Sequence, residues 1–211
     1  KSKKMNNSIP SKISVDAALN ALEKRREDQV VVSTMTVMKP WREQFESDRD
    51  LFCVGFMGGA STFGLGVQLA RPDVPVWIFD GDGSLAMQLG SLLTIANAAP
   101  RKFLHIVFHN GIYATSGAQP VLAEGRMSFA EMAKGAGYAE AVVFNDIESF
   151  ELALDDLLKI EGPVFVELLT EPTGESFKSP NNPPVVHPAG ERALPSALAS
   201  RWPIVKEALQ G

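Results

Sequence analysis

The chain has 211 residues, 45% of them hydrophobic, and a formal net charge of −5 at pH 7. This length suffices for one well-buried domain and is too short for two large ones. The negative charge argues against a general nucleic-acid or anionic-membrane surface. The single cysteine, Cys53, cannot form an internal disulfide, and its apolar neighbours favour a buried thiol. No signal peptide or membrane span is visible, so the cytoplasm is the expected location.

The N-terminal part of the chain predicts one helix and one short strand. Ser14 can cap a helix whose apolar residues fall on one face, and residues 29–33 form an apolar run typical of a strand. Residues 34–50 mix a proline with many charges and are predicted to be a loop. Thr34 and Thr36 follow the strand, where a diphosphate could lie; hydroxyls bonded to their own backbone are an equally good interpretation.

Two apolar strands, at 74–80 and 103–109, flank a helical run that begins at Ser84. A helix of about 14 residues rises roughly 21 Å, and about 7 strand residues return roughly 23 Å. A right-handed βαβ unit would therefore bring Asp82 and Asn110 to the same edge of a parallel sheet. That edge, at the carboxyl ends of the strands, is where open α/β sheets bind their ligands.

The residue types at this edge indicate a diphosphate and a metal ion. Gly81 and Gly83 let the backbone approach a phosphate closely, and Ser84 opens a helix whose free N–H groups attract anions. The carboxylate of Asp82 would repel a diphosphate unless a divalent cation separated the two. Mg²⁺ prefers six oxygen ligands. The Asp82 carboxylate, the Asn110 side-chain oxygen and one backbone carbonyl just beyond would supply three.

The sequence Gly-Asp-Gly-Ser at 81–84, the 26 residues from Ser84 through His109, and then Asn110-Gly111 resemble a known motif. It is the thiamine-diphosphate motif of the 2-oxo acid decarboxylase and acetolactate synthase superfamily. The family usually has two consecutive Asn residues, and in this chain His109 takes the place of the first. The resemblance implies that Asp82, Asn110 and the backbone carbonyl of Ile112 hold Mg²⁺. It also implies cofactor contacts for the other residues at both strand ends: Gly81, Gly83, Ser84, Gly111 and Tyr113.

A second glycine-rich patch, at 55–61, leads into the run Gly-Val-Gln-Leu-Ala at 66–70. In the family, the equivalent stretch places backbone groups on the aminopyrimidine ring, and an apolar side chain wedges the cofactor into a bent shape. Alignment on 66–70 implies that Met57 is the wedge and that the Gly55 carbonyl lies near the pyrimidine amine. A methionine in an apolar run is also common as core filling.

Gly81-x-Gly83-x-x-Ala86 also fits a dinucleotide-binding fingerprint. The acidic residue that would hold a ribose after the next strand is absent, and Asn110 stands there instead. The sequence therefore favours thiamine diphosphate over a dinucleotide.

The segment after Asn110 is polar and punctuated by glycines, which is typical of a loop built over a site. Asn-Gly-x-Tyr followed by Ser-Gly-x-Gln resembles a loop of phosphonopyruvate and sulfopyruvate decarboxylases. The resemblance implies that Thr115, Ser116 and Gln119 help to position the cofactor or substrate. Ordinary loop chemistry is the alternative interpretation.

The three histidines give no catalytic residue. His105 lies inside an apolar strand and is predicted to be structural, and His187 lies far along the chain. His109 precedes a proposed metal ligand, but strand alternation points its side chain away from that of Asn110.

The second half of the chain continues the alternation of strands and helices. Ser128 is expected to cap a helix to about residue 135, and Asp146 to begin another to about 159. Strands are predicted at 140–144 and 163–169. The whole pattern predicts an α/β fold, a single doubly wound parallel sheet with helices on both faces.

That domain is expected to span residues 1–171, with its core at about 30–170. Seven of the 14 prolines lie from Pro172 to Pro203. Residues 172–211 are therefore predicted to be an extended arm, closed by a short helix at 204–210. Such an arm could wrap a partner subunit or be poorly ordered.

Enzymes of the resembled superfamily build their site between two α/β domains, and the second domain carries an activating Glu. The chain is too short to contain both domains. The resemblance therefore implies that a separate pyrimidine-domain chain completes the site, or that this chain is a fragment. In two-gene sulfopyruvate decarboxylases, the diphosphate domain is a β subunit of about this size.

We expect the β subunit of a Mg²⁺- and thiamine-diphosphate-dependent decarboxylase, acting within a hetero-oligomer on a small 2-oxo acid such as sulfopyruvate or phosphonopyruvate. Three alternatives stay open. The chain could be the C-terminal domain of an acetolactate-synthase-like enzyme, a non-catalytic cofactor-binding module, or a plain nucleotide-binding protein.

Overall fold

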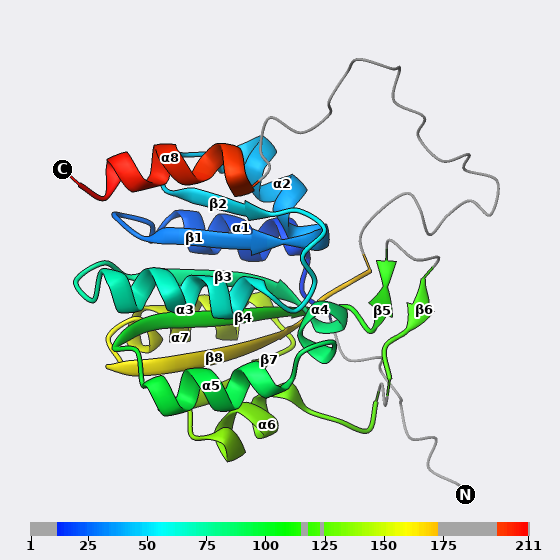
Figure 1. Cartoon of the computed structure of the whole chain (residues 1–211). Helices are drawn as coiled ribbons and strands as arrows, with labels where there is room; N and C mark the ends of the chain where they lie inside the picture. The colour runs from blue at the N-terminus through cyan, green and yellow to red at the C-terminus, as the bar shows by residue number, and fades with distance from the viewer. Residues whose placement is uncertain (1–11, 115–117, 123–124, 173–197, 211) are drawn as a thin grey trace, which may run out of the picture.

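The computed structural model of the protein describes residues 12–114, 118–122, 125–172 and 198–210. Its centre is a six-stranded sheet with the strand order β2-β1-β3-β4-β8-β7, in which neighbouring strands are parallel (Figure 1). The predicted parallel α/β sheet is thus confirmed. The strands are β1 (Val30–Thr34), β2 (Asp50–Cys53), β3 (Val76–Gly81), β4 (Lys102–His109), β7 (Glu140–Phe144) and β8 (Gly162–Leu169).

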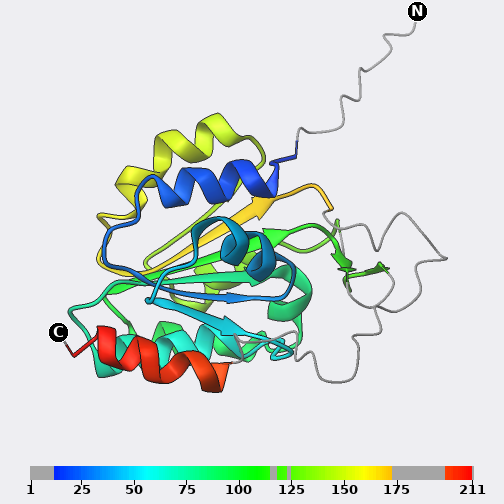
Figure 2. The same ribbon diagram turned by 90° about the horizontal axis from the view of Figure 1, so that it is seen from above.

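Helices cover both faces of the sheet, which makes the fold doubly wound (Figure 2). One face packs against α3, α5, α6 and α8, and the other against α1, α2 and α7. The helices are α1 (Val15–Glu23), α2 (Met35–Phe45), α3 (Ala60–Ala70), α4 (Asp82–Ala86), α5 (Gly90–Ala98), α6 (Phe129–Ala136), α7 (Ile147–Leu157) and α8 (Leu198–Ala208). The strand order reverses between β1 and β3, which is where open α/β sheets form a ligand crevice.

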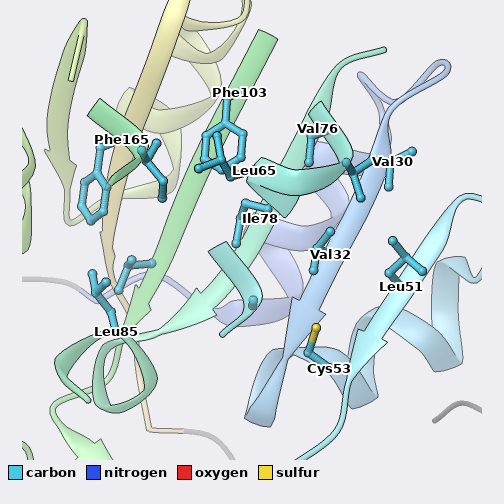
Figure 3. Close-up of a cluster of buried hydrophobic side chains, with 14 of the residues drawn as sticks. Val30, Val32, Leu51, Cys53, Leu65, Val76, Ile78, Leu85, Phe103 and Phe165 are labelled. Atoms are coloured by element: carbon cyan, nitrogen blue, oxygen red, sulfur yellow. The ribbon is translucent and has the colours of Figure 1, made fainter. Parts of the chain in front are cut away.

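The central strands are apolar on both faces because each face is covered. In β1, Val30 and Val32 belong to one hydrophobic cluster and Val31 to the other, as period-two alternation requires. Figure 3 shows the first cluster, in which Leu65 of α3 packs over the sheet. Cys53, at the end of strand β2, belongs to the same cluster. Burial raises the pKa of the Cys53 thiol to about 12, so this cysteine is a protonated core residue.

The prediction of a loop at 34–50 is wrong. This segment forms helix α2 and the start of the edge strand β2. Val37 and Trp41 are buried against the sheet, and their burial outweighs the helix hydrogen bond that Pro40 cannot make. Tertiary packing here overrides the local signal of a proline among charges.

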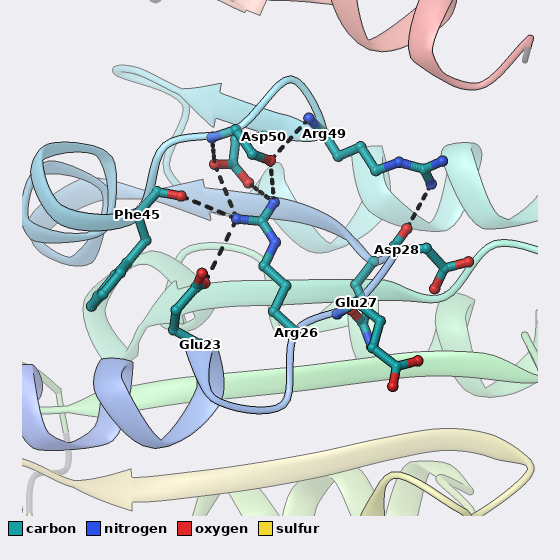
Figure 4. A network of polar contacts seen from close by, with 9 residues as sticks. Glu23, Arg26, Glu27, Asp28, Phe45, Arg49 and Asp50 are labelled. Carbon is teal, nitrogen blue, oxygen red and sulfur yellow. Dashed lines mark hydrogen bonds and ion pairs between the residues drawn. The ribbon is translucent and has the colours of Figure 1, made fainter.

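A buried ion pair between Arg26 and Asp50 holds α1, α2 and β2 together (Figure 4). The Arg26 guanidinium also donates to the carbonyl of Phe45 at 3.2 Å and lies 5.2 Å from the centroid of the Trp41 ring. The carboxylate of Asp50 accepts from the backbone N–H of Ser47 at 2.8 Å. These contacts close the turn after α2 and fix the beginning of β2.

The helix predicted from Ser84 is divided in two. α4 ends at Ala86, and α5 begins at Gly90 after an exposed turn. In this turn, the N–H of Gln88 donates to the carbonyl of Leu85 at 2.9 Å. The two residues are three apart, whereas an α-helix bonds residues four apart. The break leaves α4 as a short helix at the carboxyl end of β3.

Towards the C-terminus, the predicted elements agree with the structure to within a few residues. The side chains of Ser128 and Asp146 cap α6 and α7, as expected. α8 begins at Leu198 rather than at residue 204. Most of the predicted arm, residues 173–197, lies outside the described residues. Within the described residues, every helix is too short or too polar to cross a membrane.

Candidate functional site

A small hollow lies at the carboxyl edge of the sheet, where four segments meet. The segments follow β1, β2, β3 and β4. The convergence follows from the parallel topology, because parallel strands end at the same edge. The lining residues are Met35, Thr36, Met57, Gly81, Asp82, Gly83, Ser84, Asn110, Ile112, Tyr113 and Ala114.

The two glycine-rich patches of the sequence lie against each other in this hollow. The hydroxyl of Ser84, in α4, accepts a hydrogen bond from the backbone N–H of Gly58 at 2.9 Å. Gly58 has a φ of +79°, a conformation that favours glycine. The bond therefore joins the segment after β2 to the segment after β3.

The carboxylate of Asp82 is buried and held by two backbone N–H groups. Its Oδ1 accepts from the N–H of Gly83 at 2.8 Å, and its Oδ2 from the N–H of Gly111 at 2.6 Å. The second bond links the end of β3 to the end of β4. This link agrees with the expectation that Asp82 and Asn110 meet at the same edge of the sheet. Both residues line the same hollow.

The oxygen atoms gathered here fit the chemistry of Mg²⁺. Asp82 and Asn110 supply side-chain oxygens, and Oδ1 of Asn110 accepts from the N–H of Ile112 at 3.0 Å. Hard oxygen ligands, including carbonyl groups, are those that Mg²⁺ prefers. Among the described residues, no group of three or more His, Cys, Asp or Glu side chains could hold a metal. The predicted set is of a different kind, because it contains one acidic residue.

The ring of Tyr113 packs closely over the backbone of Gly83 at the hollow. A Cβ atom added to Gly83 would lie 2.6 Å from the ring carbons of Tyr113. A glycine at this position therefore leaves room for the ring, which stands on the two-stranded ribbon of β5 (Ile112–Tyr113) and β6 (Gln119–Pro120). The N-terminus of α4 also faces the hollow.

Three of the predicted residues that the structure describes do not line the hollow. Gly55 is exposed and has a φ of +65°, and Gly111 is buried behind the hollow, where it bonds Asp82. Gln119 lies in β6, paired with Tyr113. Thr115 and Ser116 fall outside the described residues.

Two lining residues were missed by the sequence reasoning. Met35 has a φ of 53° and follows β1, and Ala114 follows β5. Their position directly after a strand was the available signal. The hydroxyl of Thr34 donates to the carbonyl of Cys53 at 3.0 Å, so Thr34 ties β1 to β2, whereas Thr36 lines the hollow.

Behind the hollow, two buried histidines of β4 contact acidic residues. Nδ1 of His109 lies 2.7 Å from Oε1 of Glu167, and Nε2 of His109 lies 3.8 Å from Oδ2 of Asp82. Nε2 of His105 lies 3.6 Å from Oδ2 of Asp80. The sequence reasoning also missed Glu167, because a single acidic residue in an apolar strand follows no pattern.

A larger hollow, of about 560 Å³, lies at the opposite edge of the sheet. Apolar side chains near the beginnings of β3, β4 and β8 line it, among them Trp77, Phe103 and Val164. None of the predicted site residues is in its lining. The predicted site residues that line a hollow therefore do so at the carboxyl edge.

Comparisons with known proteins identify the family of this chain. Residues 29–168 match the family described as thiamine pyrophosphate enzyme, C-terminal TPP binding domain. Phosphonopyruvate decarboxylase of Streptomyces viridochromogenes is 36% identical over 69% of this chain, but the match covers 36% of that protein. Sulfopyruvate decarboxylase subunit beta of Methanocaldococcus jannaschii is 30% identical, over 82% of this chain and 91% of the subunit.

Solved structures support the fold. A thiamin-diphosphate-dependent enzyme of Mycobacterium smegmatis superposes with a TM-score of 0.65 at 21% identity, over 78% of this chain and 32% of that chain. The 2-oxoglutarate:ferredoxin oxidoreductase of Magnetococcus marinus gives a TM-score of 0.64 at 17% identity, over 84% of this chain and 69% of that chain. The chain spans about a third of the phosphonopyruvate decarboxylases that it matches. On the evidence of the family match, this chain belongs to the thiamine pyrophosphate enzymes, as their C-terminal TPP binding domain.

Proposed function

We propose that the chain is the diphosphate-binding subunit of a Mg²⁺- and thiamine-diphosphate-dependent 2-oxo acid decarboxylase. The observation that carries the proposal is the buried Asp82 carboxylate, held by the N–H groups of Gly83 and Gly111 beside Asn110. This arrangement gives an acidic candidate metal ligand inside a hollow whose other lining residues are uncharged. It suits a metal that bridges the protein to a diphosphate.

Most residues of the hollow, and several beside it, have a proposed role. Asp82, Asn110 and the carbonyl of Ile112 would hold Mg²⁺, and three residues of the Gly-Asp-Gly-Ser turn would contact the diphosphate: Gly81, Gly83 and Ser84. On the other side, Met57 would hold the cofactor in its bent form, next to the carbonyl of Gly55. Gly111 and Tyr113 would complete the cofactor contacts, and Thr115 and Ser116 would follow them along the chain.

When bound, thiamine diphosphate supplies the electron sink that decarboxylation of a 2-oxo acid requires. The residues of this chain then bind, orient and shield. The two N–H bonds fix the Asp82 carboxylate, and the Tyr113 ring covers Gly83. The activating Glu of the resembled superfamily is proposed to come from a pyrimidine-domain chain.

The substrate that we propose is a small acidic 2-oxo acid, of the sulfopyruvate or phosphonopyruvate type. Support comes from the names of the relatives, which are decarboxylases of these two acids. Three of them are named subunit beta, which supports a separate partner chain.

The test is purification of the tagged chain from its source cell, followed by identification of the chains that accompany it. We expect a stoichiometric pyrimidine-domain chain, and CO₂ release from sulfopyruvate or phosphonopyruvate only when thiamine diphosphate and Mg²⁺ are both present. A complex that binds the cofactor but turns over no 2-oxo acid would favour a non-catalytic module. Absence of cofactor binding would overturn the proposal.

A second candidate is a domain of one longer chain. It is favoured by the match to phosphonopyruvate decarboxylase, in which the aligned part is 36% of the protein. The same experiment separates the two candidates. A single tagged polypeptide much larger than 22.8 kDa would support the longer chain, whereas two polypeptides would support a split enzyme.

A further inference from the structure

The larger hollow, at the amino edge of the sheet, has a floor of three apolar side chains. Trp77, Leu104 and Val164 lie side by side across β3, β4 and β8, as the strand register shows. All three belong to the core cluster on the α1 and α7 face, and each is at most 4% exposed. Helix α7 ends at Leu157, and the turn after it, residues 158–161, forms one wall. The floor therefore offers a flat apolar surface to a guest.

Two buried hydrogen-bond donors of this hollow have no partner among the described residues. One is the indole N–H of Trp77, a residue that is 2% exposed. The other is the amide nitrogen of Gln29, which is 8% exposed; its Oε1 accepts from the N–H of Glu27 at 2.6 Å, and this bond determines which end of the amide is free. Buried donors are nearly always hydrogen-bonded in folded proteins. A guest with acceptor atoms would satisfy both.

One positive charge at the rim is also available to a guest. The charged side chains in the lining are Asp73, Arg101, Lys102, Lys159 and Glu161. Four of them already form ion pairs. Lys102 forms none with the described residues: its Nζ donates to the carbonyl of Asp73 at 2.8 Å, which leaves two of its three N–H groups. In a chain with a net charge of −5, this rim attracts an anion.

We propose that this hollow binds a small aromatic carboxylate. Its ring would lie on the apolar floor, its oxygens would accept from the N–H groups of Trp77 and Gln29, and Lys102 would meet its charge. The volume of about 560 Å³ is in the range of pockets that bind small organic molecules, roughly 300–1,000 Å³. The proposal is independent of the proposed function, because none of these residues lines the hollow at the carboxyl edge.

Two substitutions test the two donors. Gln29→Glu keeps the acceptor for the N–H of Glu27, removes the free donor and adds a negative charge that would repel the carboxylate. Trp77→Phe keeps an aromatic ring in the floor and removes the indole N–H. The matched controls make the same changes away from the hollow. They are Gln210→Glu, at an exposed glutamine, and Trp41→Phe, in the same core cluster as Trp77.

The probe is 1-naphthoate, titrated into the purified full chain with any partner chain that accompanies it. The chain has three tryptophans, so the indole signal that disappears from the ¹H–¹⁵N NMR spectrum of Trp77→Phe belongs to Trp77. We expect naphthoate to shift this signal in the wild type. Calorimetry should show affinities about 10- to 100-fold weaker in Gln29→Glu and about tenfold weaker in Trp77→Phe, with both controls unchanged.

The probe also has a control, 1-naphthylmethylammonium, which has the same ring system and the opposite charge. It should bind at least about tenfold more weakly than naphthoate, because Lys102 would repel it. Equal affinity of the two probes would mean that the floor binds any apolar ring, and would overturn the assignment of a carboxylate.

Equal naphthoate affinity in wild type and Gln29→Glu, or in Trp77→Phe should Gln29→Glu fail to fold, would overturn the site. A Trp77 signal that does not move at millimolar naphthoate would also overturn it, and would mean that water or another chain satisfies the two donors. Binding of thiamine diphosphate and Mg²⁺ is measured separately at the carboxyl edge. Failure of the naphthoate site would therefore leave the proposed function standing.

Discussion

The two histidines inside β4 share a strand face and have opposite surroundings. Nδ1 of His105 lies 3.3 Å from the hydroxyl of Tyr138, and its ring packs against Phe165 with 5.0 Å between centroids. His109, at the strand end, lies between Glu167 and Asp82. Each histidine lies near an acidic residue and an aromatic ring, but His105 is surrounded mainly by aromatic core, whereas His109 lies between two acidic residues next to the candidate site.

Proton placement also differs between the two rings. Burial, and then the negative charge of Asp80, raise the pKa of Tyr138, so its hydroxyl keeps its proton and can donate to Nδ1 of His105. The Nε2–H of His105 then faces Oδ2 of Asp80 at 3.6 Å. Nδ1 of His109 instead faces a carboxylate, Oε1 of Glu167 at 2.7 Å, to which a protonated ring nitrogen donates. Position along the strand, rather than residue type, decides whether a buried histidine serves the core or the site.

The largest effect that would sharpen this comparison is expected from Asp82→Ala. It removes the one carboxylate of the proposed metal set, so Mg²⁺-dependent affinity for thiamine diphosphate should fall by more than about 100-fold. The chain should stay folded, with a loss of about 1–3 kcal/mol in the unfolding free energy, because the buried N–H groups of Gly83 and Gly111 lose their acceptor. Calorimetric titration and urea unfolding measure the two quantities. Unchanged cofactor affinity would show that Asp82 is not a metal ligand.

Met57→Ala tests the proposed wedge residue in the same hollow as Asp82. Met57 is half-buried and lines the hollow, so the fold should persist while proton exchange at the thiazolium carbon slows about 10- to 100-fold in the assembled enzyme. Deuterium exchange followed by NMR gives the rate. Met38→Ala is the matched control, since Met38 is half-buried against the opposite core cluster. Equal exchange rates in Met57→Ala and wild type would exclude the wedge role.

Features that follow from a local stretch of sequence could be predicted, whereas features that depend on distant contacts could not. The two apolar runs around Gly81 and Asn110 predicted the βαβ unit, because strand length and parallel topology together determine where the strand ends lie. The α2 helix was missed because Pro40 among charges predicts a loop, while the burial of Trp41 is a tertiary property. Glu167 was missed because its partners are far away in the sequence.

Asp80→Asn tests the surroundings of His105, the histidine in the core. It should affect the stability of the fold rather than cofactor binding. Oδ1 of Asp80 accepts from the N–H of Gly81 at 2.8 Å, which an asparagine oxygen can also do. The new amide nitrogen would then face the Nε2–H of His105, and two buried donors would oppose each other. We expect a loss of about 1–3 kcal/mol in urea unfolding, with cofactor affinity retained. Asp73→Asn, at an exposed aspartate, is the control.

The smallest effect is expected from Tyr138→Phe, which removes only the hydroxyl that bonds His105. The loss of one buried hydrogen bond should lower the unfolding free energy by about 0.5–1.5 kcal/mol. Tyr113→Phe is the matched control, because it deletes the same group from a ring beside the hollow.

A double-mutant cycle then tests whether Tyr138 and Asp80 act through one ring. If Tyr138 sets the proton of His105 and His105 faces Asp80, the combined loss in Tyr138→Phe with Asp80→Asn should be smaller than the sum of the single losses. With the phenol gone, His105 can move its proton to Nδ1, and Nε2 can then accept from the new amide. Strictly additive losses would mean that the two residues stabilise the core independently, and that tautomer choice at His105 does not distinguish it from His109.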